Sequence, residues 1–588
     1  GSDLPPAIIH LKDTCGSFAF DYQSIYSPAG LNPDNTGVIG LDDFDSSWGI
    51  WGHNLRKVLG ANTEKVYATI NGKANDSQLC FSSGEMFRLI ESYITDNFGE
   101  KGKFRFVIAP DDTPYACTCP SCTAIGNTEK NATPAVTELI LRLSQRFPRH
   151  FFFTTSYLTT QQVTDKQLPP NAGVIVSAIN FPLRRIDGKD AKEKAFAGQL
   201  EQWKNVTKNI YIWDYINNFD DYLTPMPILK IARQRLQFFK QHGASGIFFN
   251  GSGYSYSSFD EMRTFVLSAL LINPELSVDN LTASFFNQEY PAAKKWLYDY
   301  YTDLENGTQS GKRLGIYAGI RESEKAYLTP EKFIKFYDEM NDFVSNAKGK
   351  ERKKLHELQT ALSYTRMEMG REHSFDAYGY AKRNGKSLQP IPQVQEWLTQ
   401  LKEHKAFTGM EYYNESSDEI GNYIKEWEEY IFASDLKKNL FLGVTPSVIP
   451  QAYKNHIKKL TDGTHGLPGN YHCGWVIIPE EECTINLPVK GINTSGTIYI
   501  SFLNLPRHRF YTPQQIELLK DGIIYKKIDL EPGPPAEKGE MVKTSIPADL
   551  NGTEQLSIRI TCSKKPGAQI GIDEIAFIPL KADINVAL

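Results

Sequence analysis

Short apolar runs alternate with longer amphipathic segments over residues 1–305. The runs are rich in aromatic and β-branched residues and are bounded by turn-forming residues, which is typical of buried strands. We expect strands at residues 18–22, 104–109, 151–156, 174–179, 210–215 and 246–250. Helices are predicted between them at residues 134–145, 192–203 and 227–241. This alternation predicts an α/β fold with a parallel sheet. The number of repeats, on the scale of about 250 residues that is typical of such barrels, favours a (β/α)8 TIM-type barrel over an open sheet.

The pattern becomes helical over residues 306–438. Phe333, Phe336, Met340 and Phe343 recur at intervals of three and four residues, and similar stripes follow further along the segment. Such stripes are more often core than ligand contact. We therefore expect an all-helical region packed on the barrel.

Residues 439–588 return to short alternating runs. Strands are predicted at residues 497–502, 515–519, 523–528 and 556–561. Asp521-Gly522, between two of these runs, is a strong signal for a two-residue hairpin turn. Several short strands at such intervals indicate a β-sandwich. No low-complexity linker separates the three predicted domains.

Composition and charge narrow the function classes. The chain has 588 residues, which is too long for a single core. Its 64 basic and 69 acidic residues give a formal net charge of −5 without long runs of one sign, so nothing favours a nucleic-acid or membrane-surface partner. Aromatic residues make up 12% of the chain, and aromatic faces are how proteins hold sugars, although most such rings fill cores.

Targeting signals are scarce. No apolar run approaches the ~20 residues that a membrane-spanning helix needs. The opening Gly1-Ser2 resembles a cloning remnant, so we do not expect it to belong to the fold. A secretory leader that has been cut away fits this start, and we expect the protein to be extracytoplasmic.

Asp111 and Asp112 end the strand predicted at 104–109. Chemistry in a barrel is built at the C-terminal strand ends, and glycosidases need two acidic roles. Adjacent carboxylates suit a substrate-assisted retaining mechanism, in which the 2-acetamido oxygen of the sugar attacks the anomeric carbon. Asp111 would then orient the acetamide and Asp112 would act as acid and base. The alternative is a turn that caps the next segment.

Four cysteines gather near this pair. Cys117, Cys119 and Cys122 lie within six residues, and Cys80 lies upstream. They would form a tetrathiolate zinc site or disulfides, and the sequence leaves both open. Either would be structural and would pin the loop that carries the aspartates. No cofactor is expected for catalysis.

Other strand ends carry polar and aromatic side chains. If the barrel forms, these would converge on one mouth as a glycan-binding site, with the alternative of an ordinary buried aromatic corner. The candidate substrate-binding residues are Trp51, His53, Asn54, Tyr157, Trp213, Asp214, Tyr215 and Asn250.

These features together resemble a bacterial glycosidase-like family first described as domain of unknown function 4838. The matching segments are 51–55, 78–80, 110–112 with the cysteines, 213–215 and the strand from Gly246. The resemblance implies a relation to glycoside hydrolase family 163, which comprises endo-β-N-acetylglucosaminidases that cut N-glycans. The tail, with residues 460–463, Trp475 and residues 572–578, resembles a galactose-binding-like sandwich.

Two alternatives to this hydrolase stay open. The first is a non-catalytic glycan-binding protein on a degenerate barrel, which is favoured because the family usually carries Glu where this chain has Phe249. The second is a glycosidase for uronic acids, in which Arg184 and Arg185 would clamp the substrate carboxylate. In all three readings the partner is an oligosaccharide or a glycoprotein glycan.

Overall fold

The structure is a computed structural model that describes residues 18–580, apart from 386, 433–438, 451–456, 532, 534–535, 537, 563–564 and 566. The chain divides into two compact units. Unit 1 contains the residues up to Phe219 and Met226–Ile316, and unit 2 contains Asp220–Pro225 and the residues from Tyr317. The helical and β-rich regions that the sequence separates cluster together in unit 2. Their predicted boundary, at 438, lies outside the described residues.

Unit 1 is an α/β structure built on a seven-stranded parallel sheet. The strands are β1 (Tyr22–Tyr26), β2 (Trp48–Ile50), β5 (Arg105–Val107), β6 (Phe151–Ser156), β7 (Ala172–Ser177), β8 (Asn209–Tyr215) and β9 (Gly246–Asn250). β6 and β9 occupy the predicted residues. β1 lies four residues later than the predicted strand at 18–22, because Phe18 is exposed and pairing with β9 begins only at Tyr22.

The strands of this sheet follow chain order from β2 through β5 to β9, and β1 then pairs with β9. Among the described residues, however, no strand pairing joins β1 to β2. Side chains bridge the gap, since Trp48 Nε1 donates a hydrogen bond of 2.7 Å to the Tyr22 hydroxyl. The result is a curled half-barrel, so the expected closed eight-stranded barrel is not confirmed.

The concave side of this sheet is filled by rings. Tyr22, Trp48, Phe153, Tyr211 and Phe248 are buried there in one cluster with Val107 and Ile175. Successive strand residues point to opposite faces, so the intervening residues face the helices outside the sheet. Both faces are therefore covered, which is usual for parallel sheets.

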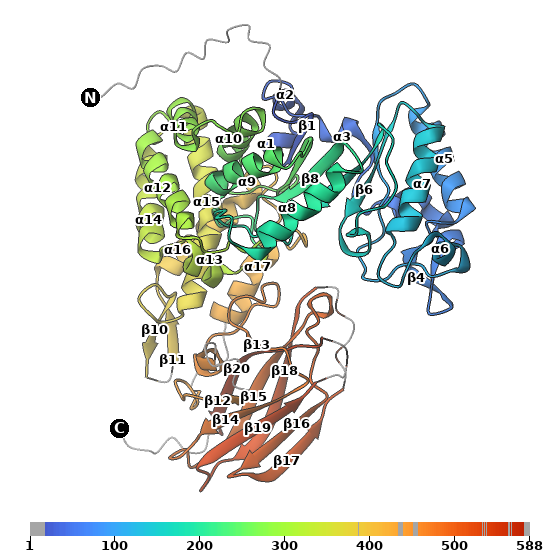
Figure 1. Ribbon diagram of the computed structural model, residues 1–588. Coiled ribbons are helices and arrows are strands. Elements are labelled where there is room, and N and C mark those ends of the chain that lie inside the picture. The colour runs from blue at the N-terminus through green and yellow to red at the C-terminus, as the bar shows by residue number, and fades with distance from the viewer. Residues whose placement is uncertain are drawn as a thin grey trace. The chain divides into compact units, whose positions relative to one another are not determined.

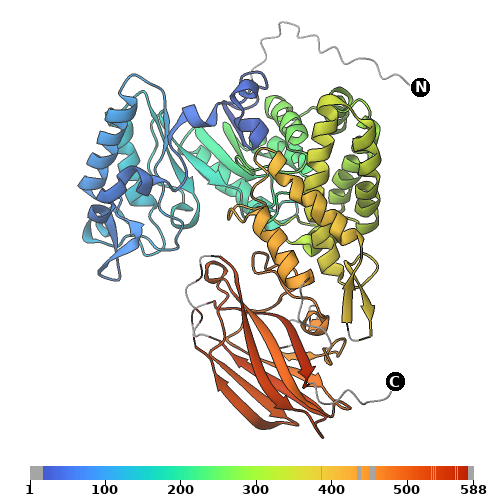
Figure 2. The same cartoon turned by 180° about the vertical axis from the view of Figure 1, so that it is seen from behind.

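Helices of unit 1 surround the sheet (Figure 1). They are α1 (Pro28–Leu31), α2 (Pro33–Thr36), α3 (Phe44–Ser47), α4 (Leu55–Leu59), α5 (Gly84–Phe98), α6 (Pro120–Ile125), α7 (Thr133–Arg146), α8 (Ala191–Lys204), α9 (Leu229–Gln241), α10 (Asp260–Ile272), α11 (Val278–Glu289) and α12 (Lys294–Gly307). Predicted helices 134–145, 192–203 and 227–241 correspond to α7, α8 and α9. α5 and α7 lie side by side at the β5–β6 end of the sheet, as Figure 2 also shows.

The long connection between β2 and β5 carries an antiparallel hairpin, β3 (Tyr67–Ile70) and β4 (Lys73–Leu79), before α5. Ser83 caps α5, because its hydroxyl accepts the N–H groups of Glu85 and Met86. Apolar side chains of this connection, of α7 and of β5 share one buried cluster. The connection is therefore packed structure, although the sequence pattern up to residue 75 is irregular.

Unit 2 begins with helices α13 (Ile320–Ala326), α14 (Pro330–Asn346), α15 (Gly349–His373), α16 (Gln393–Lys402) and α17 (Ile420–Glu426), with a short hairpin of β10 (Ala381–Asn384) and β11 (Ser387–Pro390). α15 packs against both α14 and α16. Phe333, Phe336 and Met340 of the predicted stripe are buried, as expected for core positions.

The last part of unit 2 consists of two antiparallel sheets (Figure 1). Their strands are β12 (Ser447–Ile449), β13 (Val476–Ile478), β14 (Glu482–Pro488), β15 (Ser495–Asn504), β16 (Gln515–Lys520), β17 (Ile523–Asp529), β18 (Glu540–Asp549), β19 (Gln555–Thr561) and β20 (Ile570–Pro579). Residues from both sheets share one buried core, which makes a β-sandwich. Asp521 and Gly522 both have positive φ, at 47° and 85°, which a type I′ hairpin turn requires.

None of the helices in the described part of the chain combines the length and hydrophobicity needed to cross a bilayer.

Candidate functional site

The C-terminal ends of the parallel strands bring several predicted residues to one edge of the sheet. Tyr215 of β8 is the register partner of Asn250 of β9, which in turn is the partner of Tyr26 of β1. Trp213 is likewise the partner of Ser177 of β7. These side chains share the concave face with the buried cluster, because they stand two or four residues further along the same strands.

Two indoles form the floor of this edge. Trp51 stacks on Trp213 with ring centroids 4.9 Å apart and 24° between planes, and Phe248 lies 4.4 Å from Trp51. Gly52 has φ +55°, and a Cβ there would lie 3.5 Å from the Trp213 ring. A flat aromatic surface of this kind packs against the C–H face of a sugar ring.

Asp112 and two tyrosines lie on one side of the edge. Burial is the largest cause that raises the pKa of Tyr157 to about 12. The negative charge of Asp112 and a hydrogen bond to that carboxylate raise it further. The same carboxylate contributes to the raised pKa of Tyr215, which is mainly due to burial. The Tyr215 hydroxyl lies 3.3 Å from Ser177 Oγ. Asp112 is itself exposed, and among the described residues it forms no ion pair.

Asp111, by contrast, is held firmly. Arg56 of α4 contacts its Oδ2 through Nε at 2.7 Å and Nη2 at 2.6 Å. The side chain of Gln78 binds its backbone, accepting from the Asp111 N–H at 3.1 Å and donating to the carbonyl at 3.2 Å. Arg56 compensates the charge of the carboxylate at Oδ2, and among the described residues no hydrogen bond or ion pair engages Oδ1. This arrangement suits an orienting role better than proton transfer.

His53 and Asn54 follow the aromatic floor in sequence. His53 Nδ1 donates to the Pro110 carbonyl, just before the aspartate pair, and its ring lies 6.1 Å from that of Tyr157. Asn54 precedes α4, and its side chain makes no capping hydrogen bond there. Both side chains are partly exposed beside the site.

Three polar groups at this end of β8 and β9 are buried without a hydrogen-bond partner among the described residues. They are Trp213 Nε1, both side-chain polar atoms of Asn217, and Ser252 Oγ. Asn217 is only 2% exposed. Buried polar groups are nearly always bonded, so such orphans mark a place where a ligand or solvent supplies the bonds.

Asp214 does not join the site. It is 1% exposed and forms a buried ion pair with Arg235 of α9, whose Nε donates to its Oδ2 at 2.9 Å. Because Trp213 and Tyr215 face the concave side, Asp214 between them faces the helices. The interpretation of Asp214 as a sugar ligand is corrected accordingly.

Arg184 is similarly engaged. It lies 2.9 Å from Asp190, 3.5 Å from Asp187 and 3.4 Å from Glu193, all in its own loop and helix. Arg185 is exposed. The uronic-acid alternative rested on these arginines as a carboxylate clamp, and Arg184 is already neutralised by its neighbours.

Several residues of this edge were not predicted. Arg56 and Gln78 bind Asp111 from 55 and 33 residues away, a distance at which sequence gives no signal. Ser177, however, is the last residue of β7 and follows Ile175 in the alternation, and Asn217 lies two residues beyond Tyr215 at the end of β8. Continuing the strand period to the end of β7 and past the end of β8 would have identified them.

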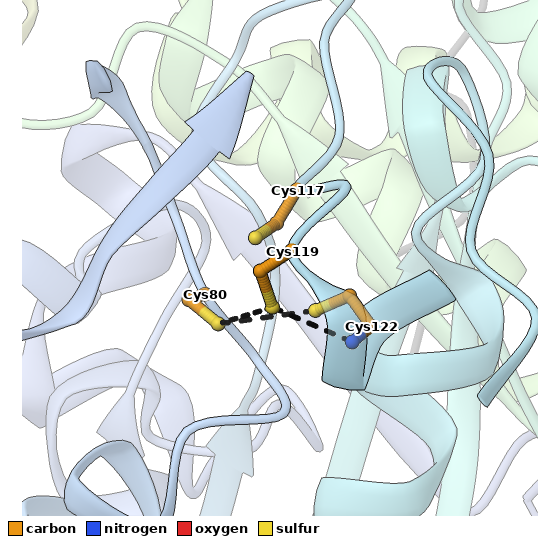
Figure 3. Close-up of side chains that lie close together, drawn as sticks. All are labelled: Cys80, Cys117, Cys119 and Cys122. Atoms are coloured by element: carbon orange, nitrogen blue, oxygen red, sulfur yellow. Dashed lines mark hydrogen bonds between the residues drawn. The ribbon is translucent and has the colours of Figure 1, made fainter. Parts of the chain in front are cut away.

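The four predicted cysteines come together in unit 1 (Figure 3). Their sulfur atoms all lie within 4.8 Å of one another, and no pair is bonded. Cys119 caps α6 by accepting the N–H of Cys122 at 3.4 Å. Hydrogen bonding from Cys122 and Cys80 lowers the pKa of Cys117.

Comparison with known proteins finds one family model that matches part of unit 1. Residues 54–303 match the family model described as "Domain of unknown function (DUF4838)". None of the curated proteins compared with the chain matches it in sequence.

Two of the similar solved structures are glycoside hydrolases. A family 89 enzyme from Clostridium perfringens, in complex with its substrate GlcNAc-α-1,4-galactose, is 11% identical with a TM-score of 0.31. The match covers 57% of this chain and 36% of the enzyme, so this chain spans about a third of its length. A family 138 enzyme that targets pectin rhamnogalacturonan II is 10% identical with a TM-score of 0.29, over 84% of this chain and 76% of that chain.

A third structure is a chitosan-binding module of a chitosanase/glucanase from Paenibacillus sp. IK-5. It is 8% identical with a TM-score of 0.15, and the match covers 24% of this chain and 98% of the module. At these TM-scores the likenesses do not establish a shared fold over the whole chain.

Proposed function

We propose, starting from the match of residues 54–303 to the DUF4838 family model, that the chain is a bacterial, extracytoplasmic glycoside hydrolase acting on N-acetylhexosamine-containing glycans. The family resemblance supports this class of substrate. We extend the proposal to the sandwich of unit 2 as a galactose-binding-like module that binds glycan.

The observation that carries the proposal is the combination at the strand ends of an aromatic floor, Trp51 on Trp213, with Asp112 beside Tyr157. Sugar recognition needs a ring surface and hydrogen-bonding groups at its rim. Asn217 and Ser252 add buried polar atoms at the same end of the sheet. This pairing of groups favours a carbohydrate ligand over other small molecules.

The proposed reaction is substrate-assisted. Asp112 donates a proton to the glycosidic oxygen as its bond to the anomeric carbon breaks, and the 2-acetamido oxygen forms a bond to that carbon. Oδ1 of Asp111 accepts the acetamide N–H and stabilises the positive charge of the oxazolinium ion. Water then attacks the anomeric carbon as the bond from that carbon to the acetamido oxygen breaks, which restores the acetamide. The water gives one proton to the Asp112 carboxylate, which restores the acid.

The test compares the wild type with Asp112→Asn on aryl β-N-acetylglucosaminides and on N-glycans. Loss of a general acid–base group is expected to lower the rate by about 10²–10⁴-fold. Asp96→Asn is the matched control, because Asp96 is exposed on α5. An unchanged rate in Asp112→Asn, with measurable wild-type turnover, would remove Asp112 from the mechanism.

The second candidate is a non-catalytic glycan-binding protein. The ion pair between Asp111 and Arg56 favours this candidate, because it engages one of the two aspartates. Among the described residues, Asp112 is then the one aspartate of the two that forms no ion pair. This candidate predicts oligosaccharide binding without turnover. Calorimetry and a product assay on the same glycan pool separate the two candidates.

A further inference from the structure

We propose that Cys80, Cys117, Cys119 and Cys122 bind one zinc ion as a tetrahedral tetrathiolate site, and that this ion joins the two segments that position Asp111. The sequence leaves zinc and disulfides equally open. The geometry of the cluster and its surroundings decide between them.

Two of the sulfur–sulfur distances match those between the ligands of one zinc ion. Cys80 Sγ lies 3.7 Å from Cys119 Sγ and 3.8 Å from Cys122 Sγ. Tetrahedral zinc with Zn–S bonds of about 2.3 Å places its sulfurs about 3.8 Å apart. A disulfide requires about 2.05 Å and a pairing of sulfurs two by two. Here all four sulfur atoms gather in one group, within 4.8 Å of one another (Figure 3).

The surroundings of the cluster suit thiolates. Cys117 is 2% exposed and Cys122 is fully buried, so ionised sulfurs there need compensation. Backbone N–H groups supply part of it, since Thr69 N donates to Cys117 Sγ at 3.3 Å and Cys122 N donates to Cys119 Sγ at 3.4 Å. Such donors around a metal site hold the ligands in place. A dication would balance the remaining charge.

The site would act as a clip on the loop that carries the aspartate pair. Cys117 lies six residues after Asp111, and Cys80 lies two residues after Gln78. Gln78 binds the backbone of Asp111 through both ends of its amide. Zinc would hold the end of β4 at a fixed distance from the loop of residues 111–122. Gln78, near that end of β4, would then hold the backbone of Asp111 in place through its two hydrogen bonds. The metal assignment does not depend on the proposed glycosidase function.

The experiment begins with metal analysis of the full chain, purified without chelator. One zinc per chain is expected, released on titration with a mercurial thiol reagent. Cobalt substitution should give the intense visible bands and sulfur-to-metal charge transfer of a tetrahedral tetrathiolate. Hydrogen exchange should rise at residues 73–80 and 111–117 when the wild type is stripped of metal.

Cys122→Ser is expected to lose the metal, whereas Cys483→Ser, which changes a buried cysteine of the sandwich, keeps it. Should Cys122→Ser not fold, the wild-type stoichiometry and the cobalt spectrum still decide. A metal-free protein with a disulfide from Cys80 to any of the other three would overturn the proposal. So would a metal-free protein with four free thiols. Zinc bound to a protein with no glycosidase activity would refute the proposed function and leave the zinc site standing.

Discussion

Replacement of Asp214 by Ala tests whether this carboxylate stabilises unit 1 or binds a ligand at the edge of the sheet. Asp214 and Arg235 are each 1% exposed and contact each other through both carboxylate oxygens. Without the carboxylate, the hydrogen bonds that other described residues offer the buried guanidinium are those to the carbonyls of Phe181 and Pro182, at 3.3 and 2.9 Å. Removing one partner of a buried ion pair costs about 3–5 kcal/mol, because the other charge is left uncompensated.

The assay must report on unit 1 alone, because a chain of two units does not unfold as a two-state system. Native-state hydrogen exchange of the amides of β8 and α9, the elements that the pair joins, meets this need. A loss of about 3–5 kcal/mol corresponds to an exchange rate about 10²–10⁴ times faster for amides that open with this core.

Two controls sharpen the result. The double variant Asp214→Leu with Arg235→Met removes both charges and should recover most of the lost protection. Asp112→Asn should leave the exchange of β8 and α9 unchanged. The structural assignment fails if Asp214→Ala keeps wild-type protection in these elements while its affinity for oligosaccharide falls.

Two pH-dependent effects follow from other residues of unit 1. In Asp112→Asn the pKa of Tyr157 should fall from about 12 towards its ordinary value of 10.0 but stay above it, because the negative charge is lost and burial remains. The difference between the tyrosinate absorbance titrations of this variant and of the wild type measures the change. An unaltered titration would contradict the contact between Asp112 and Tyr157. Burial raises the pKa of Glu305 from 4.5 to about 7, although the N–H groups of Leu229 and Lys230 bind its carboxylate. The folded state therefore binds the proton more tightly than the unfolded chain, so wild-type unit 1 should lose about 3 kcal/mol of stability as the pH rises from about 4.5 to about 7. Glu305→Gln should lack this slope in denaturant unfolding followed by hydrogen exchange, and an equal slope in both proteins would refute the assignment.

The strands that the sequence predicts best are those with both faces buried. β6 and β9 contain the apolar runs Phe151–Phe153 and Ile247–Phe249, because helices cover one face of these strands and the ring cluster covers the other. β2 spans only Trp48–Ile50 and lies within an irregular stretch, so no periodicity could reveal it. Closure of the predicted barrel requires β2 to pair with β1. Among the described residues these two strands are the unpaired edges of the sheet.

For the candidate site, residue identity was easier to predict than residue direction. The sequence identified Trp213, Asp214 and Tyr215 as one polar and aromatic strand end. The strand period alone assigns the first and third to one face and Asp214 to the other, so the error lay in not applying it. The partner Arg235 could not be foreseen, because it comes from the helix after the strand and 21 residues along the chain.

The position of Asp111 depends on a connection and not on the sheet. The strand β5 delivers the aspartate pair to the edge, but Arg56 and Gln78, which bind Asp111, both belong to the segment between β2 and β5. The cysteine cluster joins the end of that same segment, at Cys80, to the loop after Asp111. Changes in this segment that leave every strand intact should therefore move the carboxylate. The direction and the charge environment of the Asp111 carboxylate therefore depend on how residues 54–80 fold. For this reason the strand pattern predicts that Asp111 and Asp112 follow a strand end, but it does not assign a role to either of them.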